Sequence, residues 1–239
     1  MQAGARDRAS RGGPSHGRHL KGIAILYEDR DVLVVDKPPG MLTIATDREK
    51  ARTAYHILTD YVRKGNPKSR NRVFIVHRLD RETSGVLVFA KSEEAKRRLQ
   101  GQWEGTEKRY LAVVHGTLKD KAGRITTCLA ENRAHRVYVT PDPVKGKLSH
   151  TDYEALRETG AFSLLKVRLL TGRKHQIRVH LAEIGHPVVG DPRYGRGDDG
   201  HSRLALHALS VSFQHPFSGR RLTFEAPAPG WFNRLVGGP

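Results

Sequence analysis

The chain of 239 residues contains one cysteine, Cys128, so it can form neither an internal disulfide nor a zinc site with several cysteine ligands. A run of about 18 apolar residues is absent, which excludes a transmembrane helix, and the N-terminus lacks the apolar core of a secretory signal. These absences are typical of a protein from a reducing compartment. We therefore expect a cytoplasmic protein that does not associate with a membrane.

Acidic residues are few compared with basic ones: 25 Asp and Glu oppose 42 Lys and Arg, which gives a net charge of +17. Such a surface suggests a polyanionic partner, and nucleic acid is the commonest one. Residues 1–22 hold five basic residues, one acidic residue and little bulky apolar content. This composition predicts a disordered basic tail that either attracts phosphate weakly or is a solvated terminus without function. Residues 23–239 are predicted to form one domain.

Motifs of several other enzyme classes are also missing. The chain has no phosphate loop of the Walker type and no H-E-x-x-H pattern, and Ser84 follows Glu-Thr instead of lying in a nucleophile elbow. The stretch Gly195-Arg-Gly-Asp-Asp-Gly200 matches a dinucleotide-binding motif by letter, but no apolar strand leads into it and its two aspartates would repel a pyrophosphate. The 13 histidines show no clear metal-ligand spacing. We expect neither a metal nor a cofactor.

Short runs rich in β-branched residues predict strands, and amphipathic patterns predict a few helices. The expected strands are 23–27, 32–36, 73–76, 86–90, 110–114, 204–213 and 222–224, with hairpins between 123 and 170. The expected helices are 54–62 with Thr53 as its N-cap, one beginning at Ser92, 173–184 ending at Gly185, and a short one within 229–236. Strands outnumber helices and do not alternate regularly with them. This pattern predicts an α+β fold built on a long mixed, mainly antiparallel sheet flanked by helices and loops.

Two segments are dense in polar and basic side chains. Residues 77–85 connect two predicted strands, which is a common setting for a functional loop, although their composition alone would equally suit a solvated connection. In the second segment, Arg173, Lys174 and His175 crowd the start of a predicted helix, whose free N–H groups attract anions. Arg178 follows one turn later. The alternative interpretation of this segment is a basic, solvated helix face.

Both segments resemble those of the RluA family of RNA pseudouridine synthases. Four stretches carry the resemblance in the family's order: Val35-Asp-Lys-Pro-Pro-Gly40, His77-Arg-Leu-Asp80 with Thr83-Ser-Gly85, Glu107-Lys-Arg-Tyr110, and Gly172-Arg-Lys-His-Gln-Ile-Arg-Val-His180 with Gly185-His-Pro-Val-Val-Gly-Asp191. The match as a whole covers roughly residues 23–226. The resemblance implies the pseudouridine synthase catalytic fold for residues 23–239. It also implies an isomerase that converts uridine in RNA to pseudouridine without a cofactor.

The resemblance assigns three residues to the reaction, in which the N1–C1′ bond breaks, the uracil turns and C5 rejoins C1′. Asp80 matches the catalytic aspartate, whose carboxylate suits the positive charge that develops at the sugar. Arg178 matches the arginine that pairs with this aspartate. Tyr110 matches a tyrosine whose ring can stack on the base and whose hydroxyl can handle the C5 proton. Whether Asp80 attacks the sugar, adds to the base or removes a sugar proton stays open.

The resemblance also suggests which residues contact RNA. The target base must be extruded, and Arg78 either fills the gap it leaves or contacts a phosphate; we assign His77 to RNA binding as well. The residues expected to line the cleft and bind phosphates are Lys37, Lys108, Arg173, Lys174 and His175. Lys37 has an alternative role as a structural residue at a strand end.

The substrate RNA stays open between ribosomal and transfer RNA. Many relatives carry a small RNA-binding domain before the catalytic one, and the 22 residues before Ile23 are too few for it, so we expect the catalytic domain to recognise the RNA. No obligate protein partner is evident. A non-catalytic RNA-binding protein of the same fold is the alternative function. A hydrolase of free nucleosides is disfavoured by the net charge of +17.

Overall fold

The computed structural model describes residues 19–46, 49, 51–197 and 199–238. Most of the predicted basic tail, residues 1–18, lies outside the described residues. The rest of that prediction is wrong, because His19–Leu20 forms a short strand, β1, that pairs with β2 (Ile23–Glu28). Lys21 and Gly22 both adopt positive φ, 46° and 90°, and so close a tight hairpin between the two strands. The ordered domain therefore begins before Ile23.

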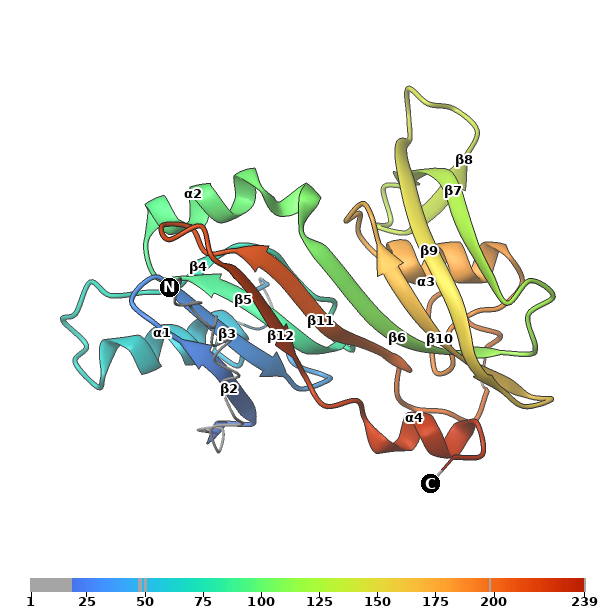
Figure 1. The fold of residues 1–239 in the computed structure, drawn as a ribbon, viewed down its shortest axis with the longest axis horizontal. Coiled ribbons are helices and arrows are strands. Elements are labelled where there is room, and N and C mark those ends of the chain that lie inside the picture. Colours follow the sequence, from blue (N-terminus) through green and yellow to red (C-terminus); the bar gives the residue numbers. More distant parts are fainter. Residues whose placement is uncertain (1–18, 47–48, 50, 198, 239) are drawn as a thin grey trace, which may run out of the picture.

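The strands form one twelve-stranded sheet in the order β1-β2-β3-β5-β11-β6-β10-β9-β7-β8, with β12 beside β11 and β4 beside β5 (Figure 1). The remaining strands are β3 (Val32–Lys37), β4 (Phe74–Ile75), β5 (Ser84–Ala90), β6 (Glu107–His115), β7 (Ala122–Glu131), β8 (Val137–Thr140), β9 (Lys147–Glu158), β10 (Phe162–Leu169), β11 (Leu206–Gln214) and β12 (Arg221–Glu225). Of the strand pairs in this sheet, β5 with β11 is parallel and the others are antiparallel. The mixed, mainly antiparallel sheet predicted from the sequence is confirmed.

The helices are α1 (Ala54–Arg63), α2 (Glu93–Gly101), α3 (Gln176–Glu183) and α4 (Gly230–Leu235), with a 3-10 turn η1 (Trp103–Gly105) after α2. The predicted N-cap is present: Thr53 Oγ1 accepts a hydrogen bond from His56 N. The helix expected to begin at Ser92 begins at Glu93, and Ser92 is its N-cap, with Oγ accepting a hydrogen bond from Ala95 N. Among the described residues, none of the helices is both long and apolar enough to cross a bilayer.

Alternation along the central strands explains why helices cover both faces of the sheet. In β3, Leu33 and Val35 share a buried cluster with α1, whereas Val32 and Val34 share another with α2. Successive strand residues point to opposite faces, so a continuous apolar run supplies a core on each side. Figure 1 accordingly shows α1 and α2 on opposite sides of β3 and β5.

One glycine holds the parallel pair at the centre of the sheet. Gly85 has φ 109°, and a Cβ built on it would lie 2.2 Å from the carbonyl oxygen of Ala208 in β11. Only glycine fits such an approach. The loop 76–83, which precedes Gly85, is thereby fixed against the middle of the sheet.

The helix expected over 173–184 begins later, at Gln176. The side-chain oxygen Oε1 of Gln176 accepts hydrogen bonds from Arg173 N and Thr171 Oγ1, at 3.0 and 2.9 Å, and His175 takes a left-handed conformation with φ 53°. These contacts stabilise a turn over 173–175 in place of a helical start. The three basic residues therefore lie in this turn and not on the helix.

Candidate active site

A cleft of about 640 Å³ opens at the centre of the sheet, between the loop 76–83, strand β6 and the turn before α3. Of the residues proposed from the sequence, Asp80, Tyr110, His77, Arg78, Lys108, Arg173, Lys174 and His175 line this cleft. Among the described residues, the lining contains five Lys and Arg side chains and a single carboxylate, that of Asp80. An isolated carboxylate in a basic cleft is a typical arrangement for chemistry on a polyanion.

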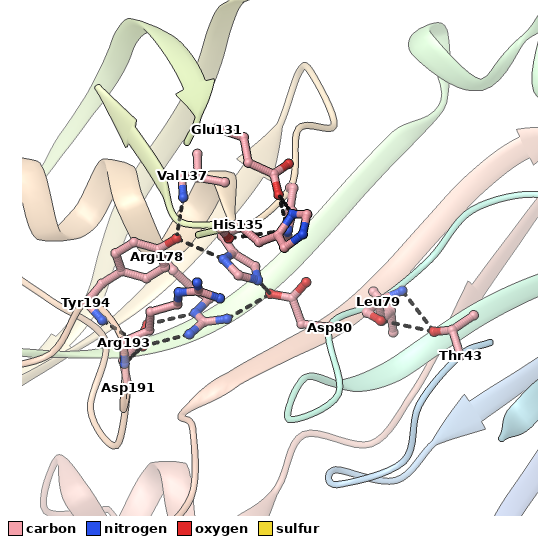
Figure 2. A network of polar contacts seen from close by, with 12 residues as sticks. Thr43, Leu79, Asp80, Glu131, His135, Val137, Arg178, Asp191, Arg193 and Tyr194 are labelled. Atoms are coloured by element: carbon pink, nitrogen blue, oxygen red, sulfur yellow. Dashed lines mark hydrogen bonds and ion pairs between the residues drawn. The ribbon is translucent and has the colours of Figure 1, made fainter. Parts of the chain in front are cut away.

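Asp80 and Arg178 form the pair that the sequence predicted (Figure 2). Arg178 Nη1 donates to Asp80 Oδ2 at 3.0 Å, while Nε and Nη2 both donate to Asp191 at 2.7 Å. The Asp80 side chain is 27% exposed and the Asp191 side chain is fully buried. Arg178 is thus fixed from behind by a bidentate ion pair and presents one remaining donor to Asp80.

Asp191 was not predicted as a site residue. Burial disfavours its charge, but the hydrogen bonds and charge of Arg178 outweigh this effect and lower the pKa of Asp191. Its Oδ1 also accepts hydrogen bonds from the backbone N–H groups of Arg193 and Tyr194, at 2.9 and 3.1 Å. Asp191 lies 13 residues after Arg178, in a turn with no periodic pattern. The sequence pointed to Asp191 only through its position at the end of the fourth stretch that resembles the RluA family.

His175 lies on the other side of the Asp80 carboxylate. Its Nε2 is 3.8 Å from Asp80 Oδ2, and its Nδ1 is 2.9 Å from the hydroxyl oxygen of Tyr194. Burial lowers the pKa of His175 in spite of the nearby Asp80 carboxylate, so the ring is uncharged near pH 7. His175 was expected to bind phosphate as a cation. In the structure it is instead a neutral ring beside the Asp80 carboxylate.

Tyr110 is on β6, next to the carboxylate and 9% exposed. Burial and the negative charge of Asp80 raise the pKa of its hydroxyl, so the phenol is protonated at neutral pH. Lys108 lies two residues earlier and lines the same cleft. Its Nζ donates to Trp103 O at 2.8 Å, and burial lowers its pKa.

The family of the chain follows from comparison with known proteins. A family model described as RNA pseudouridylate synthase matches residues 31–183. The chain belongs to this family. It is therefore an RNA pseudouridine synthase, an isomerase that acts on uridine in RNA.

Several relatives agree with this membership. The chain is 37% identical over 226 residues to the ribosomal large subunit pseudouridine synthase D of Nitrosomonas europaea, covering 90% of this chain and 64% of that protein. It is 37% identical over 220 residues to an uncharacterized RNA pseudouridine synthase, YlyB, of Bacillus subtilis, covering 90% and 72%. The chain thus spans about two thirds of the length of these relatives.

A solved structure of a human protein titled RNA Pseudouridylate Synthase Domain Containing 1 has a TM-score of 0.69 and 28% identity, covering 90% of this chain and 87% of the human chain. A second human protein of this kind, Domain Containing 4, has a TM-score of 0.71 at 22% identity, covering 87% of this chain and 89% of that one. Both support the pseudouridine synthase fold that the sequence predicted.

The residues assigned to RNA binding in this synthase differ in their surroundings. The side chain of Arg78 is exposed at the cleft and has no hydrogen-bond or ion-pair partner among the described residues. His77 instead has a structural role: its Nε2 accepts from Val88 N at 3.1 Å and its ring stacks on Trp103 at 4.5 Å. Burial lowers its pKa to about 3, so it forms a neutral wall of the cleft. Arg78 is therefore the better candidate for contact with RNA.

The expectation that Lys37 lines the cleft is wrong. Its side chain is fully buried, and Nζ donates to the backbone oxygens of Pro38, Met41 and Arg81 at 2.9 to 3.1 Å. These three acceptors satisfy the ammonium group, which has no donor left for a phosphate. Lys37 thus fastens the loop 76–83 to the turn after β3, which is the structural role that the sequence left open.

Lys174 lines the cleft at the side of the β7–β8 hairpin. Its Nζ bonds Glu131 Oε1 at 2.5 Å and the carbonyl oxygen of His135 at 3.3 Å. Figure 2 shows Glu131 and His135 near each other, above Asp80 in this view. The lysine therefore ties the turn before α3 to the hairpin.

A group of acidic residues and a histidine elsewhere does not suit a metal ion. Asp29, Asp31 and His215 lie within ligand distance of one another. However, His215 Nδ1 accepts hydrogen bonds from the backbone N–H groups of Phe217 and Ser218, so Nε2 carries the proton and donates to Asp29 Oδ2 at 3.0 Å. This histidine closes a turn and has no lone pair free for a metal.

Proposed function

We propose that the isomerisation takes place at Asp80, on a uridine of ribosomal RNA that is extruded into the central cleft. The observation that carries this proposal is the carboxylate of Asp80, fixed by Arg178 at 3.0 Å beside the Tyr110 ring. The name of the Nitrosomonas relative supports ribosomal RNA, and transfer RNA is the other candidate. A cytoplasmic location, where both RNAs occur, is part of the proposal.

The geometry suits the charge that develops when the N1–C1′ bond breaks. Asp80 Oδ2 is held by Arg178, while Oδ1 has no hydrogen-bond partner among the described residues and is available to the cleft. A carboxylate in a partly buried site stabilises a positive sugar carbon more strongly than one in water does. Arg178 orients this carboxylate through its hydrogen bond to Oδ2, and is therefore a positioning residue.

Tyr110 would act on the base after it has turned. Its hydroxyl is protonated in the resting enzyme because burial and the Asp80 charge both oppose the phenolate. When the developing cation neutralises Asp80, one of these two effects disappears and the phenol gives up its own proton more readily. The hydroxyl donates this proton to N1 of the turned base, and its oxygen takes the proton that leaves C5, so the phenol is regenerated and N1 of the product carries a hydrogen.

The test is to incubate the enzyme with ribosomal and transfer RNA from a strain that lacks it and to map pseudouridine in both. With the RNA that is modified, Tyr110→Phe is expected to slow product formation by about 10²- to 10⁴-fold and to leave RNA affinity near normal, because the ring is kept. Tyr138→Phe on β8, an exposed tyrosine, is the matched control. Full activity of Tyr110→Phe would leave the proton step without an assigned residue.

A further inference from the structure

The hydroxyl of Tyr194 lies between the β7–β8 hairpin and the ring of His175. Its oxygen accepts a hydrogen bond from Val137 N at 3.1 Å and lies 2.9 Å from His175 Nδ1. Burial raises the pKa of Tyr194, so the hydroxyl keeps its hydrogen. Among the described residues, no other acceptor lies within hydrogen-bonding distance of this oxygen. The hydrogen is therefore donated to His175 Nδ1.

This donation decides which nitrogen of His175 carries the proton. A neutral imidazole has one N–H and one lone pair, and the lone pair of Nδ1 is used on Tyr194. The proton consequently lies on Nε2, which faces Asp80 Oδ2 across 3.8 Å. In the other tautomer the Nε2 lone pair would face the carboxylate and repel it. The Tyr194 hydroxyl thus determines whether the His175 ring attracts or repels the Asp80 carboxylate.

We propose that Tyr194 is a positioning residue that holds His175 in its Nε2–H tautomer, so that the ring attracts the Asp80 carboxylate and helps Arg178 to orient it. The proposal rests on the proposed role of Asp80. The charged groups around His175 are Asp80 in the loop, Lys174 in the same turn, Arg178 on α3 and Arg193 in the turn after Asp191. Burial and the three cations oppose protonation of the ring. The ring is therefore neutral near pH 7, and only one of its two nitrogens carries a hydrogen.

The tautomer can be measured without any reaction. In protein labelled with ¹⁵N-histidine, nitrogen chemical shifts distinguish the two tautomers, and the lines of His175 are identified by their loss in His175→Gln. We expect the Nε2–H form in the wild type and a mixture in Tyr194→Phe. An Nδ1–H form in the wild type would overturn the proposal. Because this readout needs no RNA, it separates failure of the proposal from failure of the proposed function.

Kinetics supply the second readout. Tyr194→Phe should lower the single-turnover rate by about 10- to 100-fold with RNA affinity unchanged, whereas Tyr138→Phe should change neither. A purely structural role would lower the melting temperature of Tyr194→Phe and leave its rate near that of the wild type, well below the melting point; that result would refute the proposal. In the His175→Gln background, where no tautomer exists, Tyr194→Phe should cause no further loss of rate.

A separate surface suggests where the RNA extends beyond the cleft. The segment from α1 to β4 carries five basic residues, and no acidic residue occurs between Asp60 and Asp80. The basic residues are Arg63, Lys64, Lys68, Arg70 and Arg72. Beside this segment is a hollow of about 600 Å³ whose lining includes Arg30, Lys64, Arg72 and Lys91, with Glu28 as its single carboxylate.

The carboxylate in this hollow is already engaged. Glu28 accepts hydrogen bonds from Lys91 Nζ at 2.9 Å and from the Tyr61 hydroxyl at 2.6 Å. Within the described ranges, Arg30, Lys64 and Arg72 form no ion pair with a carboxylate, and the Arg72 guanidinium lies 4.9 Å over the Phe74 ring. Three unneutralised cations thus lie together at this hollow.

The hollow is close to the cleft along the chain. Arg72 lines the hollow, and Ile75, three residues later, lines the cleft. The Cα atoms of Arg72 and Ile75 therefore lie within about 11 Å of each other. From the unneutralised cations of this hollow and its closeness to the cleft, we infer that the hollow and the 63–72 segment bind the phosphate backbone of the substrate RNA that flanks the target uridine. This second inference also rests on RNA being the substrate.

The test compares two variants of equal charge. Lys64→Gln, Arg70→Gln and Arg72→Gln together remove cations from the segment, and Arg97→Gln, Lys119→Gln and Arg234→Gln remove three exposed cations scattered over the rest of the surface. The first triple should reduce the salt dependence of binding to a long RNA, with the slope falling by about 0.7–0.9 for each phosphate that is no longer neutralised. The control triple should change it little.

A short stem-loop that ends near the target should be far less sensitive to the first triple than the long RNA. The inference would be overturned if the two triple variants changed the salt dependence of binding equally, or if the first triple variant affected long and short RNA equally. Either result would mean that the net positive charge of the whole protein, and not this segment, attracts the RNA. Binding of the wild type to RNA in the same titration verifies the proposed function independently.

Discussion

Asp80→Asn is expected to reduce turnover by more than about 10⁴-fold, the scale seen when an essential group is removed from an enzyme. The amide has the shape of the carboxylate but lacks the charge that opposes the developing cation. Folding should be nearly unaffected, because Arg178 keeps its two bonds to Asp191 and is not left unpaired. RNA affinity should stay the same or rise slightly, since a negative charge leaves a basic cleft.

Single-turnover product formation, filter binding and a thermal melt on the same preparation measure these three quantities. Glu82→Gln, in the same loop and with a half-exposed side chain, makes the same chemical change beside the site and serves as the control. Turnover of Asp80→Asn at the wild-type rate would end the proposed role of this carboxylate. A melting temperature far below that of Glu82→Gln would mean that Asp80 acts mainly in folding.

Arg178→Met is expected to lower the free energy of unfolding by about 3–5 kcal/mol, because it leaves the fully buried Asp191 without its counter-ion. Turnover should fall as well, since Asp80 loses the donor that orients it. The loss of stability should depend on pH. In the wild type, Arg178 lowers the pKa of Asp191, so this stabilisation is present above the unfolded pKa and is lost as pH falls through the folded one.

In Arg178→Met, burial without a partner should instead raise the pKa of Asp191, so the variant gains stability relative to the wild type as the carboxyl group is protonated. Thermal melts should therefore show a difference in melting temperature between the wild type and Arg178→Met that is smaller at about pH 4 than at about pH 7. Adding Asp191→Asn, which removes the charge that was left unpaired, should recover part of the loss at neutral pH. The buried-charge explanation would be contradicted if the difference in melting temperature did not depend on pH and the double variant were no more stable than Arg178→Met.

The sequence predicted the features that depend on local patterns. The N-cap at Thr53 and the apolar run of β3 follow from side-chain chemistry within a few residues, and the structure has them. The α+β class followed from the order of strands and helices. Asp80, Tyr110 and Arg178 were assigned through the family resemblance; in the structure Asp80 and Tyr110 line one cleft, and Arg178 donates a hydrogen bond to Asp80.

Features that depend on distant partners were missed. Lys37 is a lysine after a strand, and nothing local shows that three carbonyl groups from two segments enclose its ammonium group. Asp191 and Tyr194 gain their roles from Arg178 and His175, which lie in another segment. The Gln176 side chain that stabilises the turn at His175 is itself held by β9, where its Nε2 donates to His150 O and Thr151 Oγ1 at 2.9 Å. Each of these is a tertiary effect that propensity and periodicity do not contain.

The parallel pair held by Gly85 has a consequence for the synthesis of the protein. Strand β11 lies between β5 and β6, although it begins at Leu206, far along the chain from their ends at Ala90 and His115. Contacts of such long range form slowly, and during translation they cannot form until the later segment has left the ribosome. The loop that bears Asp80 therefore has no finished support while β5 and β6 are already exposed. A nascent chain that ends before β11 should have an incomplete sheet with two unpaired strand edges, and it should need protection from aggregation until this late strand has been made.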